Sequence, residues 1–210
     1  MNGMEQFFGI YDGELDAGFC QDIIRRFEGD ERKVQGMGGH GNGGVVDRRA
    51  KATSEVLLWT HSDGWEDVNE AISTSLRTRL REYLSEWGQA LQLGIYPEEP
   101  RVTRYSLGDG FLAWHADNVG RSPTRVITAI WYLNTVHEGG ETWYKWQDVA
   151  VKPVEGRLLL CPVGWPFIHR GNPPLSGPKY ILITQLHQRS PQAVHTEHRP
   201  AQTEGLRRTG

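Results

Sequence analysis

The chain has 210 residues, of which 23 are basic and 26 acidic, giving a net charge of -3. This length predicts one domain with a substantial core, and the balanced charge gives no basic surface for nucleic acid. Cys20 and Cys161 lie far apart, which excludes a disulfide framework and a zinc-knuckle spacing. The start resembles no secretory leader and no span of about 18 apolar residues follows, so we expect a cytoplasmic protein that does not enter the membrane.

The N-terminal half is predicted to be mainly helical. Residues 14–28 predict a helix with Asp16 as its N-cap, and residues 52–60 predict a strand. A longer helix is predicted over residues 65–92, because apolar residues recur there at spacings of three and four. This apolar stripe indicates packing and carries no chemistry.

A glycine-rich segment from Gly36 to Gly44 separates the first helix from the first strand. Gly36, Gly38 and Gly41 match the letters of a dinucleotide fingerprint. No apolar strand precedes them and no helix follows, so nucleotide binding is disfavoured. The segment is either a plain surface loop or a lid over a site, and its length favours the lid.

From residue 101 onward the pattern changes to short β segments divided by Gly and Pro. Eight strands are predicted, over residues 102–106, 111–116, 125–133, 141–146, 149–153, 157–162, 166–170 and 179–187. Together with the preceding helices they predict a mainly β fold, a cupin-like jelly roll (double-stranded β-helix) braced by N-terminal helices. We expect a single domain over 1–189, with helical support in 1–100 and the jelly-roll core in 101–189. The polar residues 190–210 are expected to be a disordered tail.

A His-x-Asp pair, His115 and Asp117, stands at the end of the second of these strands. Side chains two residues apart in an extended segment point to the same face. An imidazole nitrogen and a carboxylate oxygen can therefore reach one metal ion. Two ligands hold a redox metal poorly, so a third is needed.

His169 is the best candidate for the third ligand. It follows a short apolar run, and a jelly roll brings its late strands beside its early ones. The remaining histidines lie in loops, turns, the end of the last strand or the polar tail: His40, His61, His137, His187, His195 and His198. A second metal pair in the tail is disfavoured against a solvated tail.

Two His and one carboxylate are the ligand set of non-haem Fe(II) oxygenases, although zinc hydrolases use it too. Lys179 bears on this choice, because it opens the last strand and can project into the barrel. A buried Lys requires an anionic partner, whereas an exposed Lys at a strand start requires nothing. Combined with the three ligands, a buried Lys179 suits a co-substrate with two carboxylates, of which one binds the metal and the other pairs with the ammonium.

The chain resembles the prolyl-4-hydroxylase-like branch of the Fe(II)/2-oxoglutarate dioxygenases. The resemblance is carried by RYSLGDGFLAWHAD, RVITAIWYLN, GGET, VKPVEGRLLLCP, HRG and GPKY, which span about residues 101–187 in the order of the family. It implies an enzyme with Fe(II), with 2-oxoglutarate and O₂ as co-substrates, and with ascorbate as a further candidate cofactor.

The resemblance also implies roles for individual residues. His115, Asp117 and His169 would bind iron, and Lys179 would anchor the distal carboxylate of 2-oxoglutarate. The co-substrate pocket would further include Tyr105, Tyr132 and Thr142, although plain core packing is an equal alternative for the tyrosines. The candidates for contact with substrate are Arg125, Trp131, Trp143 and Gln185; for Arg125, a surface position is an equal alternative.

Two departures from the family pattern concern the substrate. Relatives often carry Trp six residues after the basic anchor, where this chain has Gln185, and Phe or Leu after GGET, where it has Trp143. Both departures put peptidyl proline in doubt.

The predicted reaction is hydroxylation of an unactivated C–H bond, since related halogenases lack the carboxylate that Asp117 supplies. The substrate is expected to be a prolyl residue or a proline-like molecule, with a free amino acid or other small metabolite as the alternative. A jelly roll that binds peptide or sugar without turnover would leave the three ligands and Lys179 unexplained. The expected partners are thus a peptide, protein or small-molecule substrate, without nucleic acid or membrane.

Overall fold

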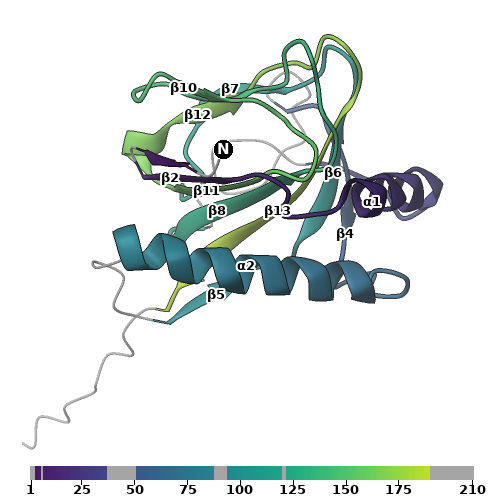
Figure 1. Cartoon of the computed structure of the whole chain (residues 1–210). Helices are drawn as coiled ribbons and strands as arrows, with labels where there is room; N and C mark the ends of the chain where they lie inside the picture. The colour runs from purple at the N-terminus through teal and green to yellow at the C-terminus, as the bar shows by residue number, and fades with distance from the viewer. Residues whose placement is uncertain (1–2, 6, 37–50, 88–93, 120–121, 190–210) are drawn as a thin grey trace, which may run out of the picture.

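A computed structural model describes residues 3–5, 7–36, 51–87, 94–119 and 122–189. It shows two facing antiparallel sheets, with helix α2 lying across the outer face of the larger one (Figure 1). The larger sheet contains β1 (Gly3–Glu5), β2 (Phe8–Tyr11), β3 (Val34–Gln35), β4 (Ser54–Leu57), β5 (Ile95–Pro97), β6 (Arg101–Tyr105), β8 (Arg125–Tyr132), β11 (Leu158–Pro162) and β13 (Lys179–Gln188). The smaller sheet contains β7 (Phe111–His115), β9 (Thr142–Tyr144), β10 (Val149–Val151) and β12 (His169–Gly171).

The strand order confirms the predicted jelly roll with helical support. The larger sheet runs β1-β2-β11-β8-β13-β6-β4-β3, with β5 also paired to β13, and the smaller runs β10-β9-β12-β7. Each strand predicted from residue 101 onward is found within two residues of its predicted bounds, except the one over 166–170. That segment divides into a 3-10 helix, η2 (Trp165–Phe167), and β12, because Pro166 lies in the first turn of the helix.

Four strands were not predicted: β1, β2, β3 and β5. They have only two to four residues each, too few to show an alternating pattern. β2 matters most for the fold, because it pairs with β11 and thereby joins the N-terminal segment to the larger sheet.

Both predicted helices are present. α1 (Ala17–Gly29) begins after Asp16, whose carboxylate accepts a hydrogen bond of 2.8 Å from the Gly18 amide, as expected for the N-cap. α2 (Glu66–Trp87) follows the prediction to its last described residue, and residues 88–92 of the predicted helix lie outside the described residues. None of the described helices is both long and apolar enough to cross a bilayer.

Two apolar clusters fill the space on either side of the larger sheet. One lies between this sheet and the helices, and includes Trp131, Leu182 and Ile72. The other lies between the two sheets, and includes Ile130 and Tyr144. Alternate residues of β8 therefore face opposite clusters.

Some predictions fall on residues that the structure does not describe. These are the proposed lid, apart from Gly36, the tail 190–210, and the histidines His40, His195 and His198.

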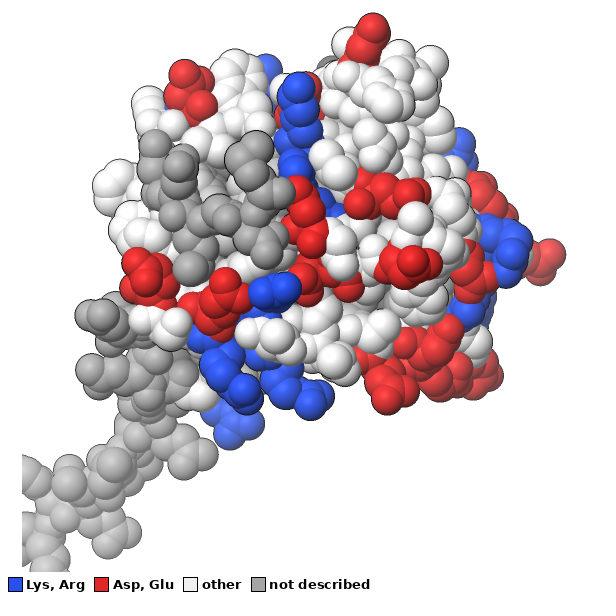
Figure 2. Space-filling view, in the orientation of Figure 1, with Lys and Arg blue, Asp and Glu red and all other residues white. Residues whose placement is uncertain are grey.

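On the face shown in Figure 2, basic side chains form small groups bordered by acidic ones.

Candidate active site

The three predicted ligands meet at one point between the sheets. In the smaller sheet His169 of β12 lies directly opposite His115 of β7, and their ring centroids are 4.4 Å apart. Asp117 follows β7 by two residues. Its Oδ1 lies 3.5 Å from His115 Nε2, and its Oδ2 lies 3.8 Å from His169 Nε2. One ligand atom from each residue falls within 4.8 Å of the others, which is a separation that one metal ion can bridge.

Hydrogen bonds from the chain fix the orientation of both imidazole rings. His115 Nδ1 lies 2.9 Å from the carbonyl oxygen of Ala113, and His169 Nδ1 lies 3.0 Å from that of Phe167. Since a carbonyl only accepts, each Nδ1 carries the proton and donates it. Each Nε2 therefore presents a lone pair toward Asp117, which is the arrangement that a metal requires.

The protonation states also suit a metal. Burial, followed by the effect of His115, lowers the pKa of His169 to about 4, so this ring is neutral at pH 7. Burial alone would raise the pKa of Asp117. The effects of His169, His115 and the Thr128 hydroxyl, which donates a hydrogen bond of 2.6 Å to Oδ2, outweigh it and hold that pKa well below its usual range. The site thus offers a neutral imidazole from His169 and an ionised carboxylate from Asp117.

Lys179 lies in the same cavity as the three ligands. Its side chain is only 2 % exposed, and Nζ donates to the Gly140 carbonyl at 2.9 Å and lies 4.5 Å from the centre of the Tyr105 ring. Gly140 belongs to the GGET motif and has φ +76°, in the left-handed region that glycine adopts without strain. Among the described residues no carboxylate lies within ion-pair distance of this ammonium, so it is available to an anionic ligand.

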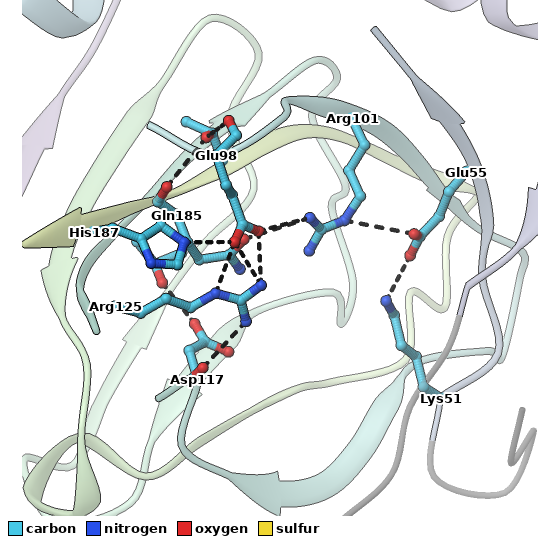
Figure 3. A network of polar contacts seen from close by, with 10 residues as sticks. Lys51, Glu55, Glu98, Arg101, Asp117, Arg125, Gln185 and His187 are labelled. Atoms are coloured by element: carbon cyan, nitrogen blue, oxygen red, sulfur yellow. Dashed lines mark hydrogen bonds and ion pairs between the residues drawn. The ribbon is translucent and has the colours of Figure 1, made fainter. Parts of the chain in front are cut away.

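A polar network lies beside the cavity (Figure 3), and it reaches the cavity lining through Lys51, Arg101 and Gln185. Glu98, which follows β5, receives three hydrogen bonds from Arg125 and contacts His187 and Arg101. Arg125 also donates to the Asp117 carbonyl oxygen at 3.1 Å, which connects the network to the predicted metal site. Arg101 leads on to Glu55, which pairs with Lys51 at 2.5 Å.

Residues 100–187 match the family model of the 2OG-Fe(II) oxygenase superfamily, and they contain the three ligands, Lys179 and most of the cavity wall. This part of the chain belongs to that superfamily. The chain is accordingly an oxidoreductase whose His115, Asp117 and His169 fit Fe(II), with 2-oxoglutarate as co-substrate. A search of curated proteins gave no match.

Solved structures of prolyl hydroxylases share the fold of this oxygenase. The viral collagen prolyl hydroxylase from Paramecium Bursaria Chlorella virus-1, in its 2OG complex, has a TM-score of 0.63 and 19% identity, covering 88% of this chain and 97% of that chain. The prolyl hydroxylase from Trichoplax adhaerens, in complex with a hypoxia inducible factor peptide, has a TM-score of 0.66 and 20% identity, covering 86% and 83%. A Pseudomonas putida prolyl-4-hydroxylase has a TM-score of 0.57 and 16% identity, covering 87% and 93%.

The residues predicted for the co-substrate pocket of the oxygenase lie near Lys179. Tyr105 stands opposite Lys179 in the β6–β13 pair and lines the cavity, as does Thr142. Tyr132 lies behind Thr142, and the two hydroxyls are hydrogen-bonded at 2.8 Å. Burial raises the pKa of Tyr105 and Tyr132, so both phenols stay neutral. Tyr132 therefore positions Thr142, and its own hydroxyl is not in the cavity lining.

The four residues predicted to contact substrate separate into two pairs. Gln185 lines the cavity, and Arg125 belongs to the polar network beside it. The prediction for the two tryptophans has to be corrected. Trp131 is fully buried on the helix side of the larger sheet, where its Nε1 donates to Ser75 in α2. Trp143 lies on the side of β9 opposite Thr142, and its ring packs against the Arg170 guanidinium at 4.8 Å. Neither ring lines the cavity.

Sequence reasoning missed Arg101, Thr103, Lys51 and Glu55 as cavity or network residues. A signal for the first two was present, because Arg101, Thr103 and Tyr105 alternate along β6 and therefore share a face. Lys51 and Glu55 gave no comparable signal, since the position of Glu55 depends on how β4 pairs with β6 and that of Lys51 on its bridge to Phe111.

Removing the Thr128 hydroxyl tests the support of the carboxylate ligand. We expect Thr128→Val, which keeps the side-chain shape, to lower Fe(II) affinity by about 10- to 100-fold, because Asp117 loses the hydrogen bond that orients it. Anaerobic Fe(II) titration measures the effect. Thr78→Val, on the exposed face of α2, is the matched control and should bind iron as the unmodified protein does. Equal iron affinity in Thr128→Val would contradict the prediction.

Lys179 should make co-substrate binding depend on pH. Burial lowers the pKa of Lys179 from its usual 10.5 to about 8 in the ligand-free protein. The affinity for 2-oxoglutarate should therefore fall as pH rises above about 8, because a neutral amine cannot pair with a carboxylate.

The stability of the ligand-free protein should change in the opposite direction. Between about pH 8 and 10.5 the unfolded chain binds more protons than the folded one, so Lys179 adds up to about 3 kcal/mol to the free energy of unfolding as pH rises.

Calorimetric 2-oxoglutarate titrations and urea unfolding at pH 7 to 10 check both trends. Lys179→Met is the control. It should remove the part of each pH dependence, of 2-oxoglutarate affinity and of the free energy of unfolding, that comes from Lys179. A 2-oxoglutarate affinity that is constant up to pH 10 would count against an anchoring ammonium.

Proposed function

We propose that the chain is an Fe(II)- and 2-oxoglutarate-dependent hydroxylase of an unactivated C–H bond. The observation that carries the proposal is one cavity that contains both the His115, Asp117 and His169 triad and the buried ammonium of Lys179. Bound Fe(II), with 2-oxoglutarate and O₂, supplies the oxidising chemistry: 2-oxoglutarate is converted to succinate and CO₂, and one oxygen atom enters the substrate.

The residues of the chain hold and orient the reactants. The two Nε2 atoms and the Asp117 carboxylate would bind the metal from one side and leave its other positions to the reactants. Lys179 would pair with the distal carboxylate, and the Thr142 hydroxyl, fixed by Tyr132, would donate to the co-substrate. Apolar side chains of β13, Ile181 and Ile183, line the same cavity and help to exclude water.

A prolyl residue or a proline-like molecule is the first substrate to test. Support comes from structures with the same fold, which are named as prolyl hydroxylases. A free amino acid or other small metabolite is the second, and it is favoured by Gln185, an amide that lines the cavity and is 2 % exposed.

The test is succinate formation by the purified protein supplied with Fe(II), 2-oxoglutarate and O₂. We expect succinate to increase when substrate is added, and the product mass to rise by one oxygen atom. Iron titration separates this function from a jelly roll that only binds a ligand. A protein that binds no iron and forms no succinate with any prolyl peptide or amino acid would contradict the proposal.

A further inference from the structure

The cavity has a second cationic end, opposite the one formed by Lys179. Arg101, Thr103 and Tyr105 line the cavity from one face of β6. Across the β6–β13 pair, Tyr105 lies opposite Lys179, whereas Arg101 lies opposite Ile183. These two positions are four residues apart along the strand, which corresponds to about 13 Å. One 2-oxoglutarate molecule bound to the metal and Lys179 therefore leaves Arg101 to a different molecule.

The Arg101 guanidinium is held only by long contacts. Its Nη1 lies 3.4 Å from Glu98 Oε1 and 3.4 Å from Gln185 Oε1, and its Nε lies 3.5 Å from Glu55 Oε2. In contrast, Arg125 contacts the same Glu98 carboxylate at 2.7 to 2.9 Å. No hydrogen bond within the described part of the chain involves Arg101 Nη2. Arg101 thus has a hydrogen-bond donor that the described residues do not use (Figure 3).

The charges of this network leave an excess of one positive charge among the described residues. Lys51, Arg101 and Arg125 contribute three positive charges, and Glu55 and Glu98 contribute two negative ones. Asp117 lies nearby, but its charge would be offset by the metal. A buried excess of charge is costly unless a ligand of opposite charge neutralises it.

Thr103 supplies an independent sign of a ligand at this end of the cavity. Its side chain is 1 % exposed and lines the cavity between Tyr105 and Arg101. The hydroxyl is buried and has no hydrogen-bond partner in the described structure. Buried hydroxyls nearly always have a partner, so this one indicates that a polar group of a ligand completes the site.

We propose that Arg101 binds a carboxylate of the substrate, with Thr103 as a second donor, and that the substrate is a small molecule with a free carboxylate. The inference rests on the proposed function and specifies its substrate class. A guanidinium pairs with a carboxylate through two parallel hydrogen bonds, and Nη2 is the donor that such a pair would add. A prolyl residue inside a peptide has no carboxylate at this position and would leave Arg101 and Thr103 unpaired.

The experiment measures binding to protein loaded with Zn(II) and 2-oxoglutarate, which cannot turn over and is diamagnetic. Ligand-observed NMR is recorded with the twenty free L-amino acids, with their carboxamides, and with a blocked prolyl peptide. Arg101→Ala and the milder Arg101→Gln are compared with Arg104→Ala. Arg104 is the matched control, because it lies on the opposite face of the same strand, toward Glu28. Thermal unfolding establishes that each variant is folded.

We expect at least one free amino acid to bind, its carboxamide to bind at least tenfold more weakly, and both Arg101 variants to lose at least tenfold in affinity. Arg104→Ala should bind the amino acid normally, and the affinity of the Arg101 variants for 2-oxoglutarate should stay within twofold. The proposal would be overturned if no free acid binds, if acid and carboxamide bind equally, or if folded Arg101 variants bind the acid normally. Failure of the proposed function itself would appear separately, as wild-type protein that binds neither metal nor 2-oxoglutarate.

Discussion

Replacing Asp117 with alanine is expected to lower Fe(II) affinity by more than about 100-fold and to abolish succinate formation. The loss should exceed the 10- to 100-fold typical of a residue that only supports a metal ligand, because Asp117 supplies the one carboxylate of the triad. Two imidazoles would remain, and they carry no negative charge to offset that of the metal. Anaerobic iron titration and a succinate assay measure the two effects.

Asp63→Ala is the control for this substitution, because Asp63 is exposed and lies outside the cavity lining. It should bind iron and form succinate as the unmodified protein does. The thermal unfolding of metal-free Asp117→Ala should show a single transition, which separates loss of iron from loss of the fold. If folded Asp117→Ala binds as much iron as the unmodified protein, the triad is not the iron site.

Replacing Lys179 with methionine is expected to weaken 2-oxoglutarate binding by about 100-fold, since a hydrogen-bonded charge inside a protein contributes about 1.5 to 3 kcal/mol. The ligand-free protein should become more stable at the same time. Methionine fills a similar volume and avoids the cost of burying an ammonium. Lys179 is 2 % exposed here, and no carboxylate among the described residues lies within ion-pair distance of its ammonium.

Isothermal titration with 2-oxoglutarate, together with urea unfolding, measures both effects of Lys179→Met. Lys152→Met provides the matched control, because Lys152 is exposed and should affect neither quantity. If 2-oxoglutarate binds Lys179→Met as tightly as the original protein, the distal carboxylate must bind elsewhere, and Arg101 would be the first alternative to test.

The metal site could be predicted largely because it follows from local rules and one property of the fold. His115 and Asp117 share a face by strand alternation, and the jelly roll brings β12 against β7. The structure places His169 directly opposite His115 in that pair. Lys179 was likewise predictable, since it begins a long strand whose interior is apolar.

The error on the tryptophans concerns the face of the strand to which each was assigned. Thr128 donates to Asp117, so the even-numbered residues of β8 face the cavity, and Trp131 must face the helices. The same rule places Trp143 on the outside, because Thr142 lies within the cavity lining. A shift of one residue exchanges the two faces of a strand, and the sequence alone did not fix which face was which.

The polar network could not be predicted, because it depends on contacts among distant segments. Glu98 follows β5 and meets Arg125 of β8 and His187 of β13 only through the pairing of β13 with both strands. In the sequence these residues are separate charges without periodicity. Their common location is a property of the assembled sheet.

The N-terminal strand β2 has a practical consequence for handling the protein. Its Phe8 ring packs against Tyr144 at 4.6 Å and Phe167 at 6.2 Å, and the Phe167 carbonyl orients the His169 ring. Removing the residues that precede the first helix would loosen His169, a predicted metal ligand. It would also expose the edge of β11, whose unpaired backbone groups could then pair with another molecule. Purification handles are therefore better placed at the opposite terminus.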